Sequence, residues 1–231
     1  MCFNETASLT AFSIGSVFLG FMLNEEIYLY SILYFTIIIM QMAEFFAHKS
    51  IKNKDTDLNK ISAIFIFLIL FIQPLAYNYY KYNYVYETNN HNIVFIISII
   101  FIIFSCYYFF YLLTNEMFEI TPLHKCYNNF CRLNWSYFSK NTLLGSIFMF
   151  LYFAIFSTDW IFKFNYNTIP NILFMPFIYL LILSILYMIF ADKIKKYKYF
   201  LSGFGSIWCI STVIFGPAVL YYHYYIDKLN I

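Results

Sequence analysis

Charged residues are scarce in this chain: Asp, Glu, Lys and Arg make up 11% of its 231 residues, whereas 62% are hydrophobic. Soluble globular domains carry about 25% charged residues. The sequence is therefore too apolar for a soluble domain of this length, and we expect an integral membrane protein. The formal net charge is only +2 and gives no support for nucleic-acid binding.

Histidine is also rare, with four in the chain, and only His48 and His223 fall within long apolar stretches, near opposite membrane faces. Seven-helix zinc hydrolases of the alkaline ceramidase and adiponectin-receptor type gather their metal with three histidines, so this chain lacks their chemistry. The last apolar stretch, 199–226, contains no lysine, which excludes retinal chemistry. We expect neither a metal nor another cofactor.

Long apolar stretches dominate the chain instead. All but the first approach or exceed the ~20 residues that cross a hydrocarbon core of about 30 Å. We therefore predict an all-α fold with one polytopic transmembrane domain over 1–231. Its seven spans lie at about 8–23, 27–48, 61–80, 93–114, 143–162, 169–191 and 199–226.

The basic residues concentrate in every second loop. With the N-terminus inside, the inner loops hold 11 of the 14 Lys and Arg residues, and the outer side holds Lys81, Lys163 and Lys228. Short loops rich in Lys and Arg stay cytoplasmic. We therefore predict a cytoplasmic N-terminus and a C-terminus on the outer side. A false span would move the later loops to the other side and remove this bias.

The five cysteines do not predict a disulfide framework. In this topology three face the reducing side and two lie within spans: Cys2, Cys126 and Cys131, then Cys106 and Cys209. The pair at 126 and 131 is too widely spaced for a zinc knuckle, and no second pair follows. Because the first seven residues carry no Lys or Arg, we expect the first span to stay as an anchor.

Two loops have predictable structure. Residues 24–26 alone join the first two spans, which predicts a tight helical hairpin. The inner loop 115–142 is long enough to hold structure of its own. Thr121 followed by Pro122 is a helix-start signal there, and the aromatic and basic residues that follow predict a short amphipathic helix at the inner interface.

Glycine is scarce, and five of the six glycines lie in the first and last spans: Gly15, Gly20, Gly203, Gly205 and Gly216. Close approach of helices in lipid requires small side chains. We therefore expect spans 1 and 7 to pack together and close the bundle into a ring.

Polar side chains within the spans are the candidates for function, because each is costly in lipid unless it is paired or functional. Gln41, Glu44 and His48 share one face of span 2. Glu44 lies about four residues, or roughly 6 Å of helix rise, from the inner end of its span. Its carboxylate suits a general base, a proton relay, a cation ligand, a headgroup clamp or a structural hydrogen-bond acceptor.

Two further spans carry polar candidates. Pro74 frees a helix carbonyl around Leu70, and the Gln73 amide is placed either to pair with that carbonyl or to line a widened pocket. Asp159 lies beside a tryptophan near the outer end of span 5, where such a residue usually marks the edge of a span. It lies toward the opposite face from Glu44, so these two carboxylates do not form one catalytic pair.

Four short blocks occur in order along the chain: Met-Cys-Phe-Asn at 1–4, Met-Gln-Met-Ala-Glu-Phe-Phe at 40–46, Gln-Pro at 73–74 and Phe-Gly-Ser-Ile-Trp-Cys at 204–209. They resemble blocks of a family of uncharacterised seven-helix membrane proteins found in bacteria, protists and large DNA viruses. The family usually has Ser where Asn4 stands and often has an aromatic residue near His48. The resemblance implies a seven-helix fold and implies no particular activity.

These separated blocks meet at one depth in the predicted topology, in the inner half of the membrane. We therefore hypothesise a polar site there. Its candidate residues are Gln41, Glu44, Ser206, Trp208, Cys209 and Cys2, with His48, Gln73 and Asp159 as secondary candidates.

Three classes of function fit these features. The first is a non-enzymatic binder, receptor or transporter of a lipid or small hydrophobic ligand, in which Gln41 and Glu44 fix a polar group. The second is a membrane-embedded lipid-modifying enzyme with Glu44 as acid or base and Ser206 or Cys209 as nucleophile. We rank it lower because no His or Lys is placed to activate a nucleophile. The third is a structural membrane or envelope protein, which needs no polar site. The partners we expect are the lipid bilayer and a bound lipid, with no nucleic acid.

Overall fold

The computed structural model describes residues 4–84, 91–122, 133–162, 213–221, 223 and 224. The sixth predicted span and most of the seventh lie outside the described residues. The same is true of four candidate site residues, which are Cys2, Ser206, Trp208 and Cys209.

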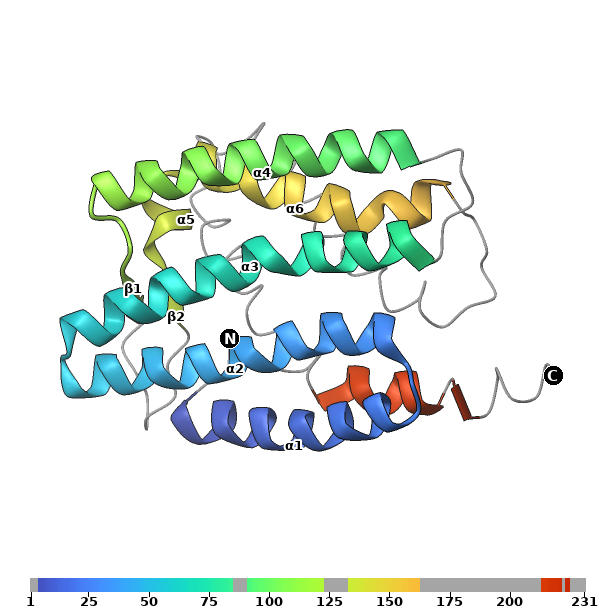
Figure 1. Ribbon diagram of the computed structural model, residues 1–231. Coiled ribbons are helices and arrows are strands. Elements are labelled where there is room, and N and C mark those ends of the chain that lie inside the picture. The colour runs from blue at the N-terminus through green and yellow to red at the C-terminus, as the bar shows by residue number, and fades with distance from the viewer. Residues whose placement is uncertain (1–3, 85–90, 123–132, 163–212, 222, 225–231) are drawn as a thin grey trace.

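Long antiparallel helices make up most of the described chain (Figure 1). Four of them are long and apolar enough to cross a membrane: α1 (Glu5–Asn24), α2 (Tyr28–Asn53), α3 (Thr56–Tyr84) and α4 (His91–Thr114). They cover the first four predicted spans. A fifth helix, α6 (Thr142–Phe162), covers the fifth predicted span and contains a shorter apolar stretch, Leu143–Phe156. The described chain is thus mostly helical, as predicted, and its helices indicate an integral membrane protein.

Capping residues set the ends of these helices. Asn4 Oδ1 accepts a hydrogen bond from the Ala7 N–H at 2.7 Å and so caps the start of α1. The α1–α2 connection is tight, as its length predicts, and Ile27 N–H donates to the Met22 carbonyl at 2.9 Å. Glu26 turns the chain there with a φ of 59°. Helices α1 and α2 therefore form a close hairpin.

The turn between α2 and α3 is shorter than predicted, because both helices extend into the predicted loop between residues 48 and 61. Helix α2 continues to Asn53, where Lys54 adopts the left-handed conformation with a φ of 55°. Asp55 Oδ1 then accepts from the Leu58 N–H at 2.9 Å at the start of α3. The helices end where the backbone is capped, because lysines near a helix end do not themselves stop a helix.

A small hairpin and a short helix connect α4 to α6. Strands β1 (Ile120–Pro122) and β2 (Leu133–Trp135) pair antiparallel, and α5 (Ser136–Lys140) follows β2 directly. No helix starts at Thr121, because Thr121 and Pro122 belong to β1, and residues 123–132, where the predicted amphipathic helix would continue, lie outside the described residues. Helix α5 lies at the end of this loop, and its residues Tyr137 and Phe138 are buried in the bundle.

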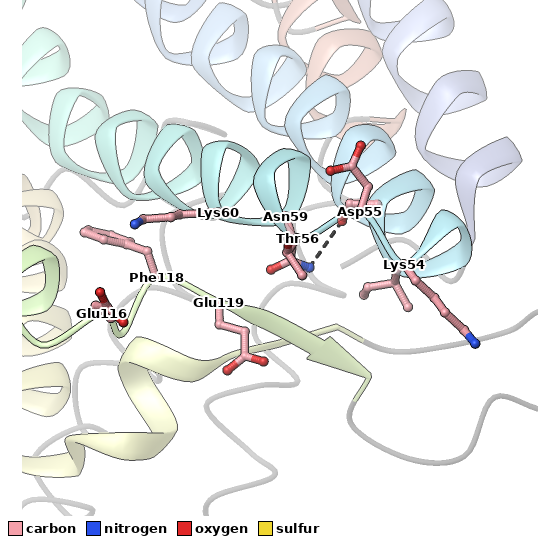
Figure 2. Close-up of a pocket in the computed structure, with 10 residues that line it drawn as sticks. Lys54, Asp55, Thr56, Asn59, Lys60, Glu116, Phe118 and Glu119 are labelled. Atoms are coloured by element: carbon pink, nitrogen blue, oxygen red, sulfur yellow. Dashed lines mark hydrogen bonds between the residues drawn. The ribbon is translucent and has the colours of Figure 1, made fainter.

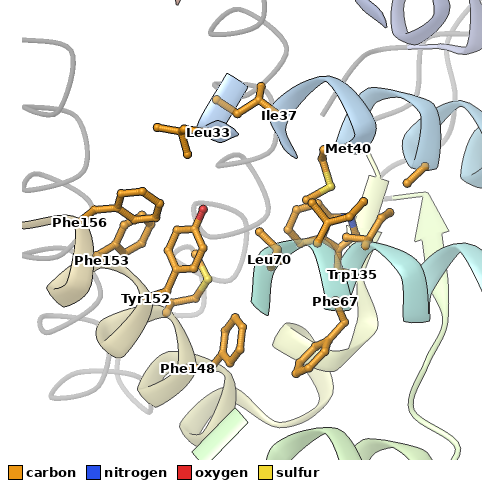
Figure 3. Close-up of a cluster of buried hydrophobic side chains, with 14 of the residues drawn as sticks. Leu33, Ile37, Met40, Phe67, Leu70, Trp135, Phe148, Tyr152, Phe153 and Phe156 are labelled. Atoms are coloured by element: carbon orange, nitrogen blue, oxygen red, sulfur yellow. The ribbon is translucent and has the colours of Figure 1, made fainter. Parts of the chain in front are cut away.

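Aromatic side chains fill the core (Figure 3). Among the described residues, the ten largest fully buried side chains are all Phe or Tyr. The Phe67 ring lies at the centre of one such group, with ring centroids 5.1 to 5.9 Å from those of Tyr108, Phe109, Phe118, Tyr137 and Phe148. Spacings in this range favour edge-to-face and offset packing. The core thus ties α3, α4 and α6 to the segment around α5.

The α2–α3 turn and the β1–β2 hairpin lie at the same end of the bundle (Figure 1). Lys54 lies in this turn, Lys60 lies near the start of α3, and Lys140 is the last residue of α5, which follows the hairpin. We call this the lysine-rich end. The α1–α2 hairpin turn lies at the other end.

The helical segment 213–221 lies beside α1 (Figure 1). A Cβ atom added at Gly216 would come within 2.8 Å of Phe18 Cβ on α1 and 2.7 Å of Tyr34 Oη on α2. Glycine therefore permits a close approach of this segment to both helices.

Candidate functional site

The predicted polar face of α2 points into the bundle. Gln41 and Glu44 are fully buried, and His48 is nearly so. Tyr137 of α5 lies close to Glu44: burial raises the pKa of Tyr137 most strongly, and the nearby Tyr108 and Glu44 raise this pKa further. The Glu44 carboxylate therefore lies within electrostatic range of the Tyr137 hydroxyl.

Gln73 joins α3 to α6. The Tyr152 hydroxyl donates to Gln73 Oε1 at 2.6 Å, and both side chains are fully buried. Gln73 Nε2 has no hydrogen-bond partner among the described residues. The expectation that this amide pairs with the carbonyl of Leu70 is therefore wrong, and its oxygen serves as a helix-to-helix link instead.

Asn59 fixes the hairpin to the lysine-rich end. Its side chain bonds the backbone of Ile120 in both directions, since Nδ2 donates to the carbonyl at 2.9 Å and Oδ1 accepts from the N–H at 2.8 Å. Nδ2 also lies 3.2 Å from Ser50 Oγ. One asparagine thus holds β1 against α2 and α3, although Asn59 and Ile120 are 61 residues apart in the sequence.

Ser136 and Tyr108 hold the rest of the segment that connects α4 to α6. The Ser136 hydroxyl donates to the Met117 carbonyl at 2.7 Å, and the Ser136 N–H donates to the Glu119 carbonyl at 3.0 Å. The Tyr108 hydroxyl of α4 donates to the backbone carbonyl of Tyr137. Backbone groups of the buried loop are therefore satisfied by side chains, as burial requires.

Other buried donors have no acceptor within the described parts of the chain. They include Gln73 Nε2, Trp135 Nε1 and the Tyr137 hydroxyl. A buried donor without an acceptor is costly. The interior therefore combines the Glu44 carboxylate with donor groups inside an aromatic core.

A pocket of about 400 Å³ opens at the lysine-rich end (Figure 2). We call it the loop pocket. The turn between α2 and α3 forms one side, and the segment that follows α4 forms the other. Its lining includes Lys54, Asp55, Asn59, Lys60, Glu116, Phe118 and Glu119.

A second depression, of about 160 Å³, lies between α3 and α4. We call it the lateral groove. It is lined by Phe67, Leu68, Phe71, Ser105, Cys106, Phe109 and Phe110. Ser105 is buried, and its hydroxyl has no hydrogen-bond partner in the described chain, whereas Cys106 and Phe110 are exposed. The groove is thus apolar and opens on the outer surface of the helices.

Phe118 connects the two depressions. It lines the loop pocket, and its ring centroid lies 5.8 Å from that of Phe67 and 5.4 Å from that of Phe109. Both of these partners line the lateral groove. Neither depression is lined by Glu44, so the predicted site and the hollows of the described surface are separate features.

The structure tests the predicted convergence only in part. Gln41 and Glu44 share a buried face, whereas Cys2, Ser206, Trp208 and Cys209 lie outside the described residues. Asp159 belongs to the backbone of α6, and its side chain is not described. Within the described chain, no three His, Cys, Asp or Glu side chains gather as a metal site would require.

Sequence reasoning missed Asn59, Tyr152 and both depressions. Asn59 lies near lysines at the start of α3, and Tyr152 is one of 24 tyrosines, so neither residue type marks its role. A hydrogen bond between residues 79 positions apart, as for Gln73 and Tyr152, leaves no local pattern. Comparison of the chain with protein-family models, curated proteins and solved structures finds no match.

Proposed function

We propose that this protein is a non-enzymatic lipid-binding membrane protein that holds an acyl chain in the lateral groove. The groove is the observation that carries this proposal. Its volume of about 160 Å³ is below the roughly 300–1,000 Å³ of sites for compact ligands, and an acyl chain is narrow enough to enter it. Ser105 lies nine residues from the end of α4 at Thr114, or roughly 13 Å of helix rise, which is within one leaflet.

The proposed setting is a bundle of seven spans with the N-terminus and the lysine-rich end in the cytoplasm. The 11 to 3 distribution of basic residues supports this orientation. The position of the α2–α3 turn and the hairpin at one end of the bundle is consistent with it (Figure 1). The close approach of Gly216 to Phe18 supports packing of the first and last spans. The resemblance to the seven-helix family remains part of this proposal.

Membrane-embedded lipid chemistry is the second candidate, and the buried Glu44 beside Tyr137 favours it. In this alternative Glu44 acts as acid or base, with Ser206 or Cys209 as the nucleophile. We rank lipid binding first because the groove exposes apolar surface to the bilayer, whereas the described depressions do not reach Glu44.

Native mass spectrometry of the full chain, purified gently with its lipids, tests both candidates. Cys106→Phe fills the groove, and we expect it to reduce lipid retention severalfold. Ile100→Phe is the matched control, because Ile100 is exposed on α4 and does not line the groove. Equal retention by wild type and Cys106→Phe would contradict lipid binding in the groove. A modified lipid that disappears in Glu44→Gln would favour the enzyme, and retention of no lipid by any variant would favour a structural role.

A further inference from the structure

The loop pocket has the size and position of a headgroup site. Its volume of about 400 Å³ lies within the range of small-molecule sites. It forms where α2 and α4 end and α3 begins, and helix ends of membrane-spanning segments lie near the lipid headgroups. Hydrogen bonds fix two of its lining residues, because Asn59 bonds both Ser50 and the backbone of Ile120. The pocket is therefore built before any ligand arrives.

Charges of both signs face this pocket, but some are already engaged. Asp55 accepts a hydrogen bond from the Leu58 N–H, and Glu119 pairs with Lys140 at 2.8 Å. Among the described residues, Lys54, Lys60 and Glu116 form no ion pair. Figure 2 shows Lys60 on the α3 side and Glu116 on the opposite side, with Phe118 between them. The pocket thus offers cations and a carboxylate at separate positions.

This arrangement fits a ligand that carries both charges. A purely anionic headgroup would meet the carboxylates of Asp55, Glu116 and Glu119, and a purely cationic ligand would meet two lysines. A phosphate near Lys60 and an ammonium near Glu116 would each have an opposite charge. A primary ammonium also donates hydrogen bonds to a carboxylate. A quaternary ammonium cannot do so and is usually bound by an aromatic cage.

We propose that the loop pocket binds the zwitterionic headgroup, a phosphate joined to a primary ammonium, of the lipid whose acyl chain occupies the lateral groove. This inference rests on the lipid binding proposed above. Phe118 supplies the continuity, because it lines the pocket and packs against Phe67 and Phe109 of the groove. Lys60 and Glu116 then determine which headgroup is held, and the groove holds the chain.

The test uses the delipidated full-length chain in detergent and native mass spectrometry. Phosphatidylethanolamine, phosphatidylcholine and phosphatidylglycerol with identical acyl chains are added separately. We expect retention to fall in that order, with the ethanolamine lipid about tenfold above the glycerol lipid, as one charge-assisted hydrogen bond would give. Equal retention of the three lipids, or a preference for the anionic one, would overturn the inference.

Glu116→Gln removes the carboxylate charge and is expected to abolish the preference for the ethanolamine lipid. Glu26→Gln is the matched control. Glu26 is also an exposed glutamate in the left-handed conformation after a helix, but it lies at the other end of the bundle. An unchanged preference in Glu116→Gln, or an equal loss in both variants, would contradict the role of the pocket.

Soluble phosphoethanolamine separates the headgroup from the acyl chain. We expect it to bind the wild type and Cys106→Phe equally, and to bind Glu116→Gln more weakly. If phosphoethanolamine displaces the lipid completely, the ligand of the loop pocket is the free compound and not the headgroup of a lipid. If the lipid is not retained but phosphoethanolamine still binds in a manner that depends on Glu116, the groove proposal fails and the pocket stands. If the lipid is retained without dependence on Glu116, the pocket fails and the groove stands.

Discussion

Helices α2 and α4 are of similar length and are both apolar enough to cross a membrane, yet they occupy different environments. In the candidate span of α2, 61% of the residues are buried inside the protein, whereas in that of α4 only 22% are. Helix α2 places Gln41, Glu44 and His48 inside the bundle. Helix α4 presents isoleucine and phenylalanine side chains outward and contributes one wall of the lateral groove.

The difference shows how a helix is oriented when lipid is the solvent. Lipid tails are as apolar as a protein core, so hydrophobicity alone does not decide which face is buried. Polar side chains decide it, because their exposure to hydrocarbon is costly. The polar face of α2 therefore belongs to the protein interior. The apolar face of α4 leaves a surface on which a lipid can lie.

Truncation of an apolar side chain should give the largest contrast between the two helices. Met40 on α2 is fully buried, whereas Ile103 on α4 is 65% exposed. We expect Met40→Ala to lower the free energy of unfolding by about 2–5 kcal/mol because it leaves a cavity. Ile103→Ala should lower it by less than about 1 kcal/mol, because lipid fills the space.

Denaturation in mixed micelles with increasing SDS measures both values. A variant with a conservative change at the buried position, Met40→Leu, controls for the loss of methionine itself and should cost less than about 1.5 kcal/mol. If Ile103→Ala proves as costly as Met40→Ala, α4 is not a lipid-facing helix and the comparison fails.

The buried polar face of α2 was predictable from the sequence, whereas the β1–β2 hairpin was not. Three polar residues at helical spacing indicate one inward face, because few arrangements satisfy them in a membrane. The hairpin instead depends on Asn59, whose side chain replaces a strand partner for Ile120. A proline after threonine favours a helix start locally. A bond to a residue 61 positions earlier overrides that preference without leaving a mark in the local sequence.

The helix ends at the α2–α3 turn show the same limit. Lysines suggest an interface, and the predicted spans therefore stop short of the true helix ends at Asn53 and Thr56. The turn is set by backbone geometry at Lys54, a position where glycine would be the usual signal. The position of the lateral groove depends on which faces of α3 and α4 meet, and the mostly apolar stretches that line it do not specify those faces.

Tyr137 reports on both helices, because Glu44 of α2 and Tyr108 of α4 both raise its pKa. Its pKa is raised well above the usual value of 10.0. As the pH rises, the Tyr137 hydroxyl ionises first in the unfolded chain. The stability that this group contributes is therefore fully present below about pH 10 and is lost as the pH rises above that value. One such group contributes a slope of about 1.4 kcal/mol per pH unit.

We expect Tyr137→Phe to flatten this loss of stability above about pH 10 and to leave stability at neutral pH nearly unchanged. The second expectation follows because the Tyr137 hydroxyl has no hydrogen-bond partner among the described residues. Tyr107→Phe, at an exposed position of α4, is the matched control and should keep the wild-type slope. The same slope in wild type and Tyr137→Phe would show that Tyr137 is not buried as described.

The smallest contrast concerns two equally buried serines. Ser50 on α2 donates to the Ala47 carbonyl at 2.7 Å and accepts from Asn59 Nδ2 at 3.2 Å. Ser105 on α4 has a hydroxyl without a hydrogen-bond partner in the described chain. We expect Ser50→Ala to cost about 1 kcal/mol because it leaves the Asn59 amide one acceptor short. Ser105→Ala should be neutral or stabilise the protein by up to ~0.5 kcal/mol, since it removes a hydroxyl whose burial is not compensated by a hydrogen bond.

Unfolding in mixed micelles measures this pair as well, and lipid retention adds a second readout. Ser105→Ala keeps the lateral groove apolar and open, so bound lipid should be retained at the wild-type level. If Ser105→Ala costs as much as Ser50→Ala, the Ser105 hydroxyl is bonded and α4 carries a polar contact like those of α2. If stability is unchanged but lipid is lost, the hydroxyl contacts the lipid directly, and the groove recognises more than an acyl chain.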